Sequence, residues 1–253
     1  MLNLIRMEWY KLRTSKLFMI LLAISFVSNA LLSLAIPLFS KMLAGIPSPV
    51  NLSYALQSPF TLGLLMIVVF ISATSFSYLD FAGGYIKNIA GQVGDRGKIV
   101  ISKLIIIGVH NLIFFAVGAL SNVVGAAMAG ALVVDGNVAG GILTLLLKWL
   151  LSMAISSVLL FFTVGIRNKS LGIIGSVVFG ANVLSLAYMG ISMGLKNLLH
   201  VDINIGDYMP DALMGSVDVI NNSLVVNAIV VSAVFIAAFT ILTFIVFKKR
   251  DVK

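Results

Sequence analysis

The sequence has no cysteine and few charged residues, and both absences exclude whole classes of protein. Without cysteine the chain forms no disulfide and offers no thiolate to a metal, which leaves its redox compartment open. Charged residues make up 10% of the 253 positions, whereas soluble domains carry roughly 25%. Hydrophobic residues make up 60%. This composition excludes an ordinary soluble domain and favours a membrane protein.

The chain also lacks the motifs that enzymes use. It has no Gly-x-x-x-x-Gly-Lys-Ser/Thr phosphate loop, and so no nucleotide site of that kind. The two histidines are His110 and His200, and no paired carboxylates or Ser/His/Asp set accompanies them. The long apolar runs contain no Asp or Glu, which argues against a proton-driven antiporter. We therefore expect no catalytic residue, no metal site and no cofactor in this chain, which is not an enzyme by itself.

Six apolar runs are long enough to cross a bilayer, since a helix of about 20 residues spans the hydrocarbon and satisfies its own backbone groups. The third run exceeds that length, so we expect it to tilt, kink or protrude. The prediction is an all-α membrane protein with six transmembrane helices, formed by residues 17–253. The six runs are Leu17–Leu38, Phe60–Leu79, Leu104–Val134, Ile142–Ile166, Leu171–Met193 and Leu224–Phe247.

Basic residues indicate the orientation of the chain. Most of the seventeen lie in four short segments, at the two termini and after the second and fourth runs. Basic residues in short loops resist translocation and so mark the cytoplasmic side, which places both termini in the cytoplasm. The net charge of +8 then faces the anionic lipid headgroups of the inner leaflet, and we expect no nucleic-acid partner.

Residues 1–16 are predicted to form an amphipathic elbow helix. Leu2, Ile5, Trp9 and Leu12 recur at spacings of three and four, which places them on one helical stripe. Such a helix lies in the membrane interface, with Trp9 at the level of the headgroups. It is either a passive anchor or an elbow that also contacts a cytosolic partner. The candidate residues of the elbow are Trp9, Tyr10, Lys11 and Arg13.

The loop 80–103 is the most informative segment. Gly83 and Gly84 end the second run, and the residues after them favour a short helix. Gly94 supplies a turn, and Asp95 can cap the following helix by accepting backbone N–H bonds. A short helix at the tip of a membrane hairpin suits the groove of a partner protein. The alternative is an ordinary loop of positive-inside character.

This stretch resembles the cytosolic loop of the ABC-2 type permeases, the membrane subunits of one class of ATP-driven exporters. Their pattern is Gly-x-apolar-Lys/Arg-Asn, then Gly-x-Ser-Arg, then a basic and apolar stretch that ends in Ser-Lys. Asp95 stands where a serine is usual and the glycine lies one place late, and both departures keep a turn and a cap. The first segment, 8–16, also resembles the first helix of these permeases. The matching residues are Gly84, Lys87, Asn88, Arg96, Lys98, Ser102 and Lys103.

In this family the loop forms a coupling helix that receives force from a separate ATPase subunit, which binds Mg-ATP. The resemblance therefore implies two copies of an ABC ATPase as partners, and a second permease half that is either this same chain or another. It also implies a multi-pass protein of the bacterial cytoplasmic membrane. The residues expected to couple to the ATPase are Lys87, Asn88, Ile89, Gly94, Asp95 and Arg96.

Within the family, the size and pattern of the chain resemble permeases for bacteriocin immunity and amphipathic-peptide export, including the exporters of phenol-soluble modulins. We expect a peptide substrate that leaves the membrane or the cytoplasm by alternating access. Two alternatives stay open. One is a drug or lipid exporter of the same architecture, and the other is an ATP-independent membrane immunity or binding protein.

Two outer loops are long. The first, Phe39–Pro59, contains three prolines and is predicted to be a turn-rich connection. The second, 194–222, favours one short helix near its start and another over Tyr208–Met214. In ABC-2 permeases the corresponding region forms a pair of re-entrant helices at the exit. The alternative is a floppy acidic loop.

Polar residues inside the runs either bond to neighbouring helices or line a substrate route. The ridge Gly172, Ser176, Gly180 favours close packing or a dimer contact. The candidates for a substrate route are Ser25, Asn29, Ser72, Ser75 and Asn182.

Two ionisable residues lie in or near the runs. A lone His110 is expected to be a hydrogen-bonded core residue rather than a proton relay. We expect Lys148 to lie at the outer interface and to extend its amine towards water beside Trp149.

Overall fold

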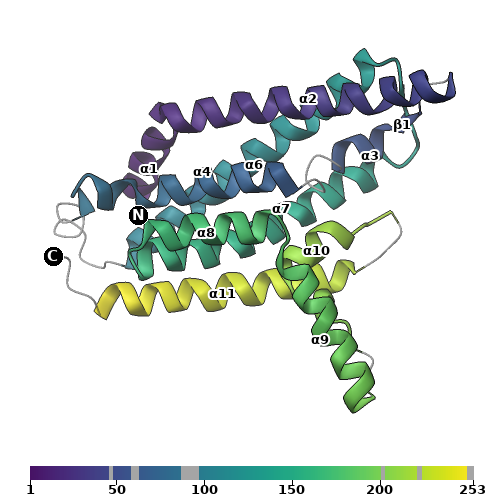
Figure 1. Ribbon diagram of the computed structural model, residues 1–253. Coiled ribbons are helices and arrows are strands. Elements are labelled where there is room, and N and C mark those ends of the chain that lie inside the picture. Colours follow the sequence, from purple (N-terminus) through teal and green to yellow (C-terminus); the bar gives the residue numbers. More distant parts are fainter. Residues whose placement is uncertain (46–47, 58–62, 87–96, 201–202, 221–223, 250–253) are drawn as a thin grey trace.

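The computed structural model describes residues 1–45, 48–57, 63–86, 97–200, 203–220 and 224–249. In these residues nearly everything is helical (Figure 1), and the prediction of an all-α membrane protein is confirmed. Among them, five helices are long and apolar enough to cross a membrane. They are α2 (Lys16–Ala44), α4 (Gly63–Ala82), α6 (Gly97–Met128), α7 (Val138–Leu160) and α11 (Val225–Lys249).

The predicted fifth span is not one straight helix. It is divided into α8 (Lys169–Gly180) and α9 (Leu184–Leu199), whose axes differ by 64°. Asn182 has a φ of 53°, a left-handed conformation that asparagine tolerates better than most residues. At 1.5 Å per residue α8 is roughly 18 Å long, less than the roughly 30 Å of hydrocarbon. A sixth crossing therefore needs both helices, and α9 leaves the bundle at a steep angle (Figure 1).

The third predicted span is a long helix with shifted ends. α6 begins at Gly97 and ends at Met128, and its 32 residues extend over roughly 48 Å. It is therefore longer than the hydrocarbon is thick, as the length of the run suggested. Gly130, with a φ of 66°, forms the turn after it. The chain then enters the short strand β2 (Leu132–Val133).

The segment predicted as a turn-rich connection has more structure than expected. α2 continues past Pro37 to a left-handed cap at Gly45. The strand β1 (Val50–Asn51) then pairs in parallel with β2. It leads directly into α3 (Leu52–Gln57), which packs on α6 and α7. This short helix therefore covers part of the surface of α6 and α7.

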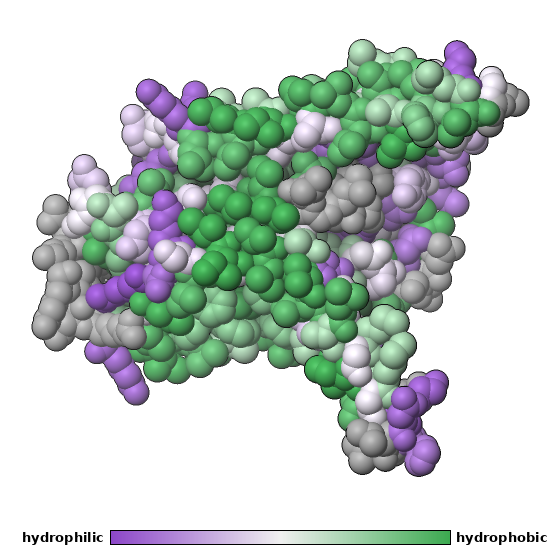
Figure 2. Space-filling model, viewed as in Figure 1, coloured by the Kyte–Doolittle hydropathy of each residue, from purple (hydrophilic) through white to green (hydrophobic). Residues whose placement is uncertain are grey.

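Basic residues gather at one end of the bundle. α1 (Leu2–Thr14), the start of α6 and the end of α11 lie together there (Figure 1), and we call this the basic end. Figure 2 shows apolar surface over the middle of the helices and hydrophilic residues mostly towards the two ends. This distribution is that of a protein whose middle faces lipid.

α4 and α8 approach each other closely along the predicted ridge of small residues. The Thr74 and Ser176 hydroxyl oxygens lie 2.8 Å apart. A Cβ atom at Gly180 would lie 2.6 Å from the backbone nitrogen of Ile67. Gly172 is also buried, against Thr74. The ridge therefore serves packing within the chain.

Gly180→Ala is expected to destabilise the protein because the new methyl group meets backbone, which cannot rotate away. We expect a loss of about 1–3 kcal/mol, as for overpacked cores. The matched control is Gly190→Ala in α9, where a Cβ would meet nothing within 4 Å; it should leave stability unchanged or raise it by up to ~1 kcal/mol. Thermal unfolding in detergent micelles measures both. Equal midpoints for the two variants would contradict the close approach of α4 and α8.

Candidate functional site: a buried charge cluster at the basic end

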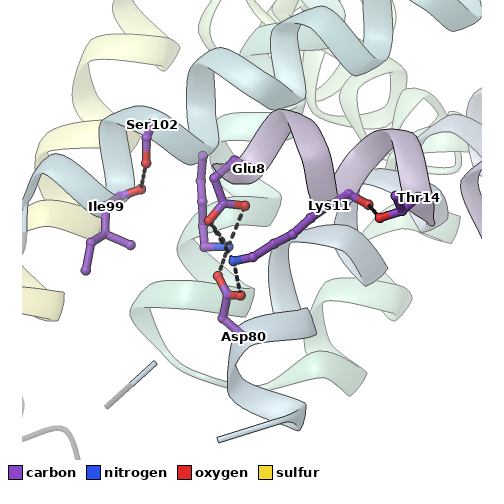
Figure 3. A network of polar contacts seen from close by, with 7 residues as sticks. Glu8, Lys11, Thr14, Asp80, Ile99 and Ser102 are labelled. Atoms are coloured by element: carbon purple, nitrogen blue, oxygen red, sulfur yellow. Dashed lines mark hydrogen bonds and ion pairs between the residues drawn. The ribbon is translucent and has the colours of Figure 1, made fainter. Parts of the chain in front are cut away.

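Four charged side chains from three helices meet at the basic end (Figure 3). Glu8 and Lys11 come from α1, Asp80 from the last turn of α4, and Lys103 from α6. The amines of Lys11 and Lys103 each lie 2.6 Å from an oxygen of Asp80 and 3.4 Å from Oε1 of Glu8. Each lysine therefore contacts both carboxylates, and the charges alternate around a ring. We call these four residues the charge cluster.

The charge cluster is buried although all four residues are charged. The exposed fractions of the side chains are 0% for Lys103, 1% for Glu8, 2% for Asp80 and 26% for Lys11. Burial of an isolated charge is costly, and two positive charges with two negative charges leave no net charge to bury. Removal of one partner from such a group typically costs about 3–5 kcal/mol, because it leaves an unpaired buried charge. The cluster therefore holds α1, α4 and α6 in one arrangement.

α1 docks on the bundle by a face that includes part of the predicted apolar stripe. Of the predicted stripe, Leu12 is buried at 1% exposure, but Leu2 and Trp9 are exposed at 80% and 41%. The buried positions are Glu8 and Leu12, which lie four residues apart on one face. The docked face therefore combines apolar residues with a paired acid, which the spacing of apolar residues alone did not indicate. The position of Trp9 in the membrane interface stays a prediction. Of the other elbow candidates, Tyr10 and Arg13 are exposed.

The residues predicted to couple to an ATPase all lie outside the described residues. They are Lys87, Asn88, Ile89, Gly94, Asp95 and Arg96. The described chain stops at Ile86, which is buried, and resumes at Gly97. Asp80 lies shortly before this segment and Lys103 shortly after it. We call the parts of the chain on either side of the segment 87–96, at the end of α4 and the start of α6, its two stems. The charge cluster therefore joins both stems to α1.

A second contact ties helix ends together near the charge cluster. α7 ends in a π-helical turn, η2 (Phe161–Gly165), and Arg167 follows in a left-handed conformation with a φ of 63°. Its guanidinium carbon lies 5.9 Å from the ring centre of Phe81 and 5.8 Å from that of Phe247. Cation–π attraction at these distances joins the basic ends of α4, α7 and α11.

A polar network crosses the middle of the bundle. His110 is fully buried, and its Nε2 lies 2.9 Å from the hydroxyl of Ser72. Its Nδ1 lies 3.0 Å from Oδ1 of Asn111. The Asn111 amide donates to Ser152 and Ser156, at 3.2 and 2.9 Å. The prediction that His110 is a hydrogen-bonded core residue is confirmed, and the network joins α4, α6 and α7.

The candidates for a substrate route do not gather in one place. Ser72 and Ser75 line a small cleft of about 30 Å³, with Ser15 and Phe18 on the opposite wall. Ser25 and Asn29 are buried on α2, where the Asn29 amide donates to the carbonyl of Ser25 at 3.1 Å. Asn182 lies at the break between α8 and α9 and is half-buried.

Lys148 is buried, and the expectation that it reaches water at the outer interface was wrong. Its exposed fraction is 2%, and its amine donates to the carbonyl of Gln57 at 3.1 Å. Gln57 ends α3, the short helix that the sequence did not predict. The neighbouring Trp149 donates from its indole to the carbonyl of Gly108 at 3.0 Å. Both polar groups therefore bond within the protein.

The end opposite the basic end holds a larger cavity. α9, the short helix η3 (Ile205–Tyr208) and α10 (Pro210–Ser216) border an open pocket of about 460 Å³. Its walls include Tyr188, whose hydroxyl donates to the buried carboxylate of Asp211 at 3.3 Å. At the same end of the bundle, Ser53 of α3 faces Asp135, which follows β2. Hydrogen bonds from the hydroxyl and amide of Ser53 lower the pKa of Asp135.

The fold and these sites define a multi-pass α-helical membrane protein whose basic end is held together by buried charge. Within the described residues, no three His, Asp or Glu side chains group as metal ligands. The model of the ABC-2 family transporter proteins matches residues 4–201, most of the chain. A comparison with curated proteins found no match.

The chain therefore belongs to the ABC-2 family of transporter proteins. As a member, it is the permease subunit of an ABC transporter and works with an ABC ATPase subunit.

Asn111→Ala is expected to destabilise the protein because it removes the acceptor for His110 and the donor for two serines. Hydrogen bonds between membrane helices average about 0.6 kcal/mol each, so we expect a loss of about 1–2 kcal/mol. The control is Ser28→Ala, whose hydroxyl bonds to its own helix and whose loss should cost less than ~0.5 kcal/mol. Unfolding in detergent compares them. A smaller loss for Asn111→Ala than for Ser28→Ala would show that the network does not join the helices.

Proposed function

We propose that this permease subunit exports amphipathic peptides, with its basic end in the cytoplasm and the segment 87–96 seated on the ATPase. The observation that carries the proposal is the charge cluster. Buried charges are expensive to build, and this set joins the elbow helix to both stems of the segment 87–96. A segment that receives force can pass it on only if its flanking residues are held rigidly against the rest of the protein. A membrane protein that transmits no force does not require this.

The proposed cycle has two states. Nucleotide binding closes a pair of ATPase subunits that hold Mg-ATP, and their closure displaces the segment 87–96. The displacement moves the spans and switches the access of a cavity from inside to outside. Binding energy at the ATPase does this work only because its contacts with the permease differ between the two states.

The assembly would contain two permease halves, and α9 offers a surface for the second. None of its described side chains is fully buried. Leu186, Met189 and Met193 are exposed at 75%, 56% and 52%. An apolar helix that projects from the bundle needs either lipid or another protein against it. The cavity beside α9 would then lie near the exit.

An amphipathic peptide suits the surfaces near the basic end. The cleft between α2 and α4 has serine hydroxyls on both walls, from Ser15, Ser72 and Ser75, and apolar side chains between them. The cleft holds about 30 Å³, room for about one water molecule, so a peptide that lies in the membrane interface would enter sideways there only when the spans move apart during the cycle. A wholly polar tunnel is then unnecessary. A drug or lipid exporter of the same architecture is the second candidate, because these walls would also accept a small amphipathic molecule.

Assembly with an ATPase is the first expected result. Purified in mild detergent, the chain should retain an ABC ATPase subunit, and the complex should hydrolyse ATP. Substitution of Lys87, Asn88 and Arg96 by alanine should abolish peptide-stimulated hydrolysis while membrane insertion stays intact. The control is Lys41→Ala, an exposed cation near the opposite end of α2, which should behave as the wild type. A chain that never retains an ATPase would instead support the ATP-independent immunity or binding protein.

Substrate class is tested in proteoliposomes that contain the complex. We expect ATP-dependent movement of an amphipathic helical peptide, and no movement of a scrambled peptide of equal charge that cannot form an apolar face. Ser75→Leu should reduce transport of the peptide because it narrows the cleft. Transport of fluorescent lipid or of a cationic dye, with none of the peptide, would favour the second candidate over a peptide exporter.

A further inference from the structure

We propose that the charge cluster stays closed throughout the transport cycle, so that α1 moves as one body with the stems of the segment 87–96. α1 then acts as a lever that passes their displacement to α2. This inference rests on the proposed function and names the residues through which the permease would receive force. Glu8, Lys11, Asp80 and Lys103 are positioning residues in this scheme.

The first argument is the arrangement of the charges. Each lysine contacts both carboxylates, so no one contact can open without weakening another. Lys103 has no exposed surface, and its amine has both of its acidic partners on other helices. Movement of α1 away from α6 would leave this cation buried without Glu8, a change that is strongly unfavourable. Movement of all the parts together costs nothing of this kind.

The second argument is that apolar packing supports the same arrangement. Leu12, one turn after Glu8, is buried at 1% exposure in the core that contains Phe18 and Phe76. Ile5 packs against that core from the preceding turn. The amine of Lys103 also lies 5.8 Å from the ring centre of Phe76. α1 is therefore held by side chains over most of its length and not by its charges alone.

The third argument is the connection to α2. A single residue, Ser15, separates the two helices, with an extended backbone at φ −72° and ψ 111°. Its hydroxyl accepts a hydrogen bond from the amide of Phe18 at 3.3 Å. One residue allows a change of direction but little slack, so a displacement of α1 must reach α2. Ser15 and Phe18 also line the cleft against Ser72 and Ser75. A displacement of α1 that reaches α2 would therefore change the width of this cleft.

Lys103→Met tests whether the cluster transmits force. In proteoliposomes with the ATPase, we expect hydrolysis to continue while the number of peptides moved per ATP falls roughly tenfold, within the usual range of coupling between sites. The matched control is Lys169→Met, the same change at an exposed position of α8, and it should behave as the wild type. An unchanged ratio for Lys103→Met would overturn the proposal.

A covalent link tests whether the cluster stays closed, and it does not depend on that variant being stable. Because the chain contains no cysteine, Glu8→Cys with Lys103→Cys introduces the pair alone. This pair removes one acid and one base, so the net charge of the cluster stays zero. A bifunctional methanethiosulfonate reagent joins the two thiols, and a reductant cleaves the link.

The linked protein should move peptide at close to the wild-type ratio, and the reduced protein should fall below it. Loss of transport on linking, with hydrolysis retained, would show that α1 must separate from α6. Equal, full coupling in the linked and reduced protein would show that the cluster transmits nothing. Either result overturns the inference while hydrolysis by the complex continues. Failure of the proposed function looks different, because the wild-type chain would then retain no ATPase, or its complex would move no peptide before any substitution is made.

Discussion

The cost of an unpaired charge away from water constrains this structure more than any other interaction. Glu8, Asp80 and Lys103 are almost completely buried, and they are tolerated because opposite charges lie within contact distance. Hydrophobic burial alone is non-directional and would let α1 slide along the bundle. The alternating ring allows one register, which fixes where α1 meets the stems of the segment 87–96. Under the proposed function, this fixed point is where force from the ATPase would enter the permease.

The same constraint acts at two other depths of the bundle. His110 and Asn111 find partners on the helices on either side, which sets the register of α4, α6 and α7. Lys148 finds the carbonyl that ends α3. In each case a polar group that cannot reach water bonds to a neighbouring helix. The sequence marked these residues as unusual, but it did not indicate which helix would supply the partner.

Close packing and broken helices divide the molecule into two parts with different properties. α4 and α8 meet with almost no space between their backbones, because Gly180 has no side chain to separate them. Beyond Asn182 the chain turns away, and α9 keeps large apolar side chains exposed. The tightly packed part contains the charge cluster and the polar network. The projecting part borders the larger cavity and is the part that a second permease half could cover.

The apolar runs determined the class and the helical fold, because hydropathy along the chain shows which segments can cross a membrane. The small-residue ridge indicated a close contact of the fifth span, but not whether that contact lay within the chain. Tertiary structure decided which residues meet. Glu8 and Lys103 are 95 positions apart, and their pairing depends on how α1 docks. The break after Gly180 and the cover that α3 gives Lys148 were missed for the same reason. Hydropathy is summed over neighbours in the chain, whereas a buried charge is stabilised by its neighbours in space.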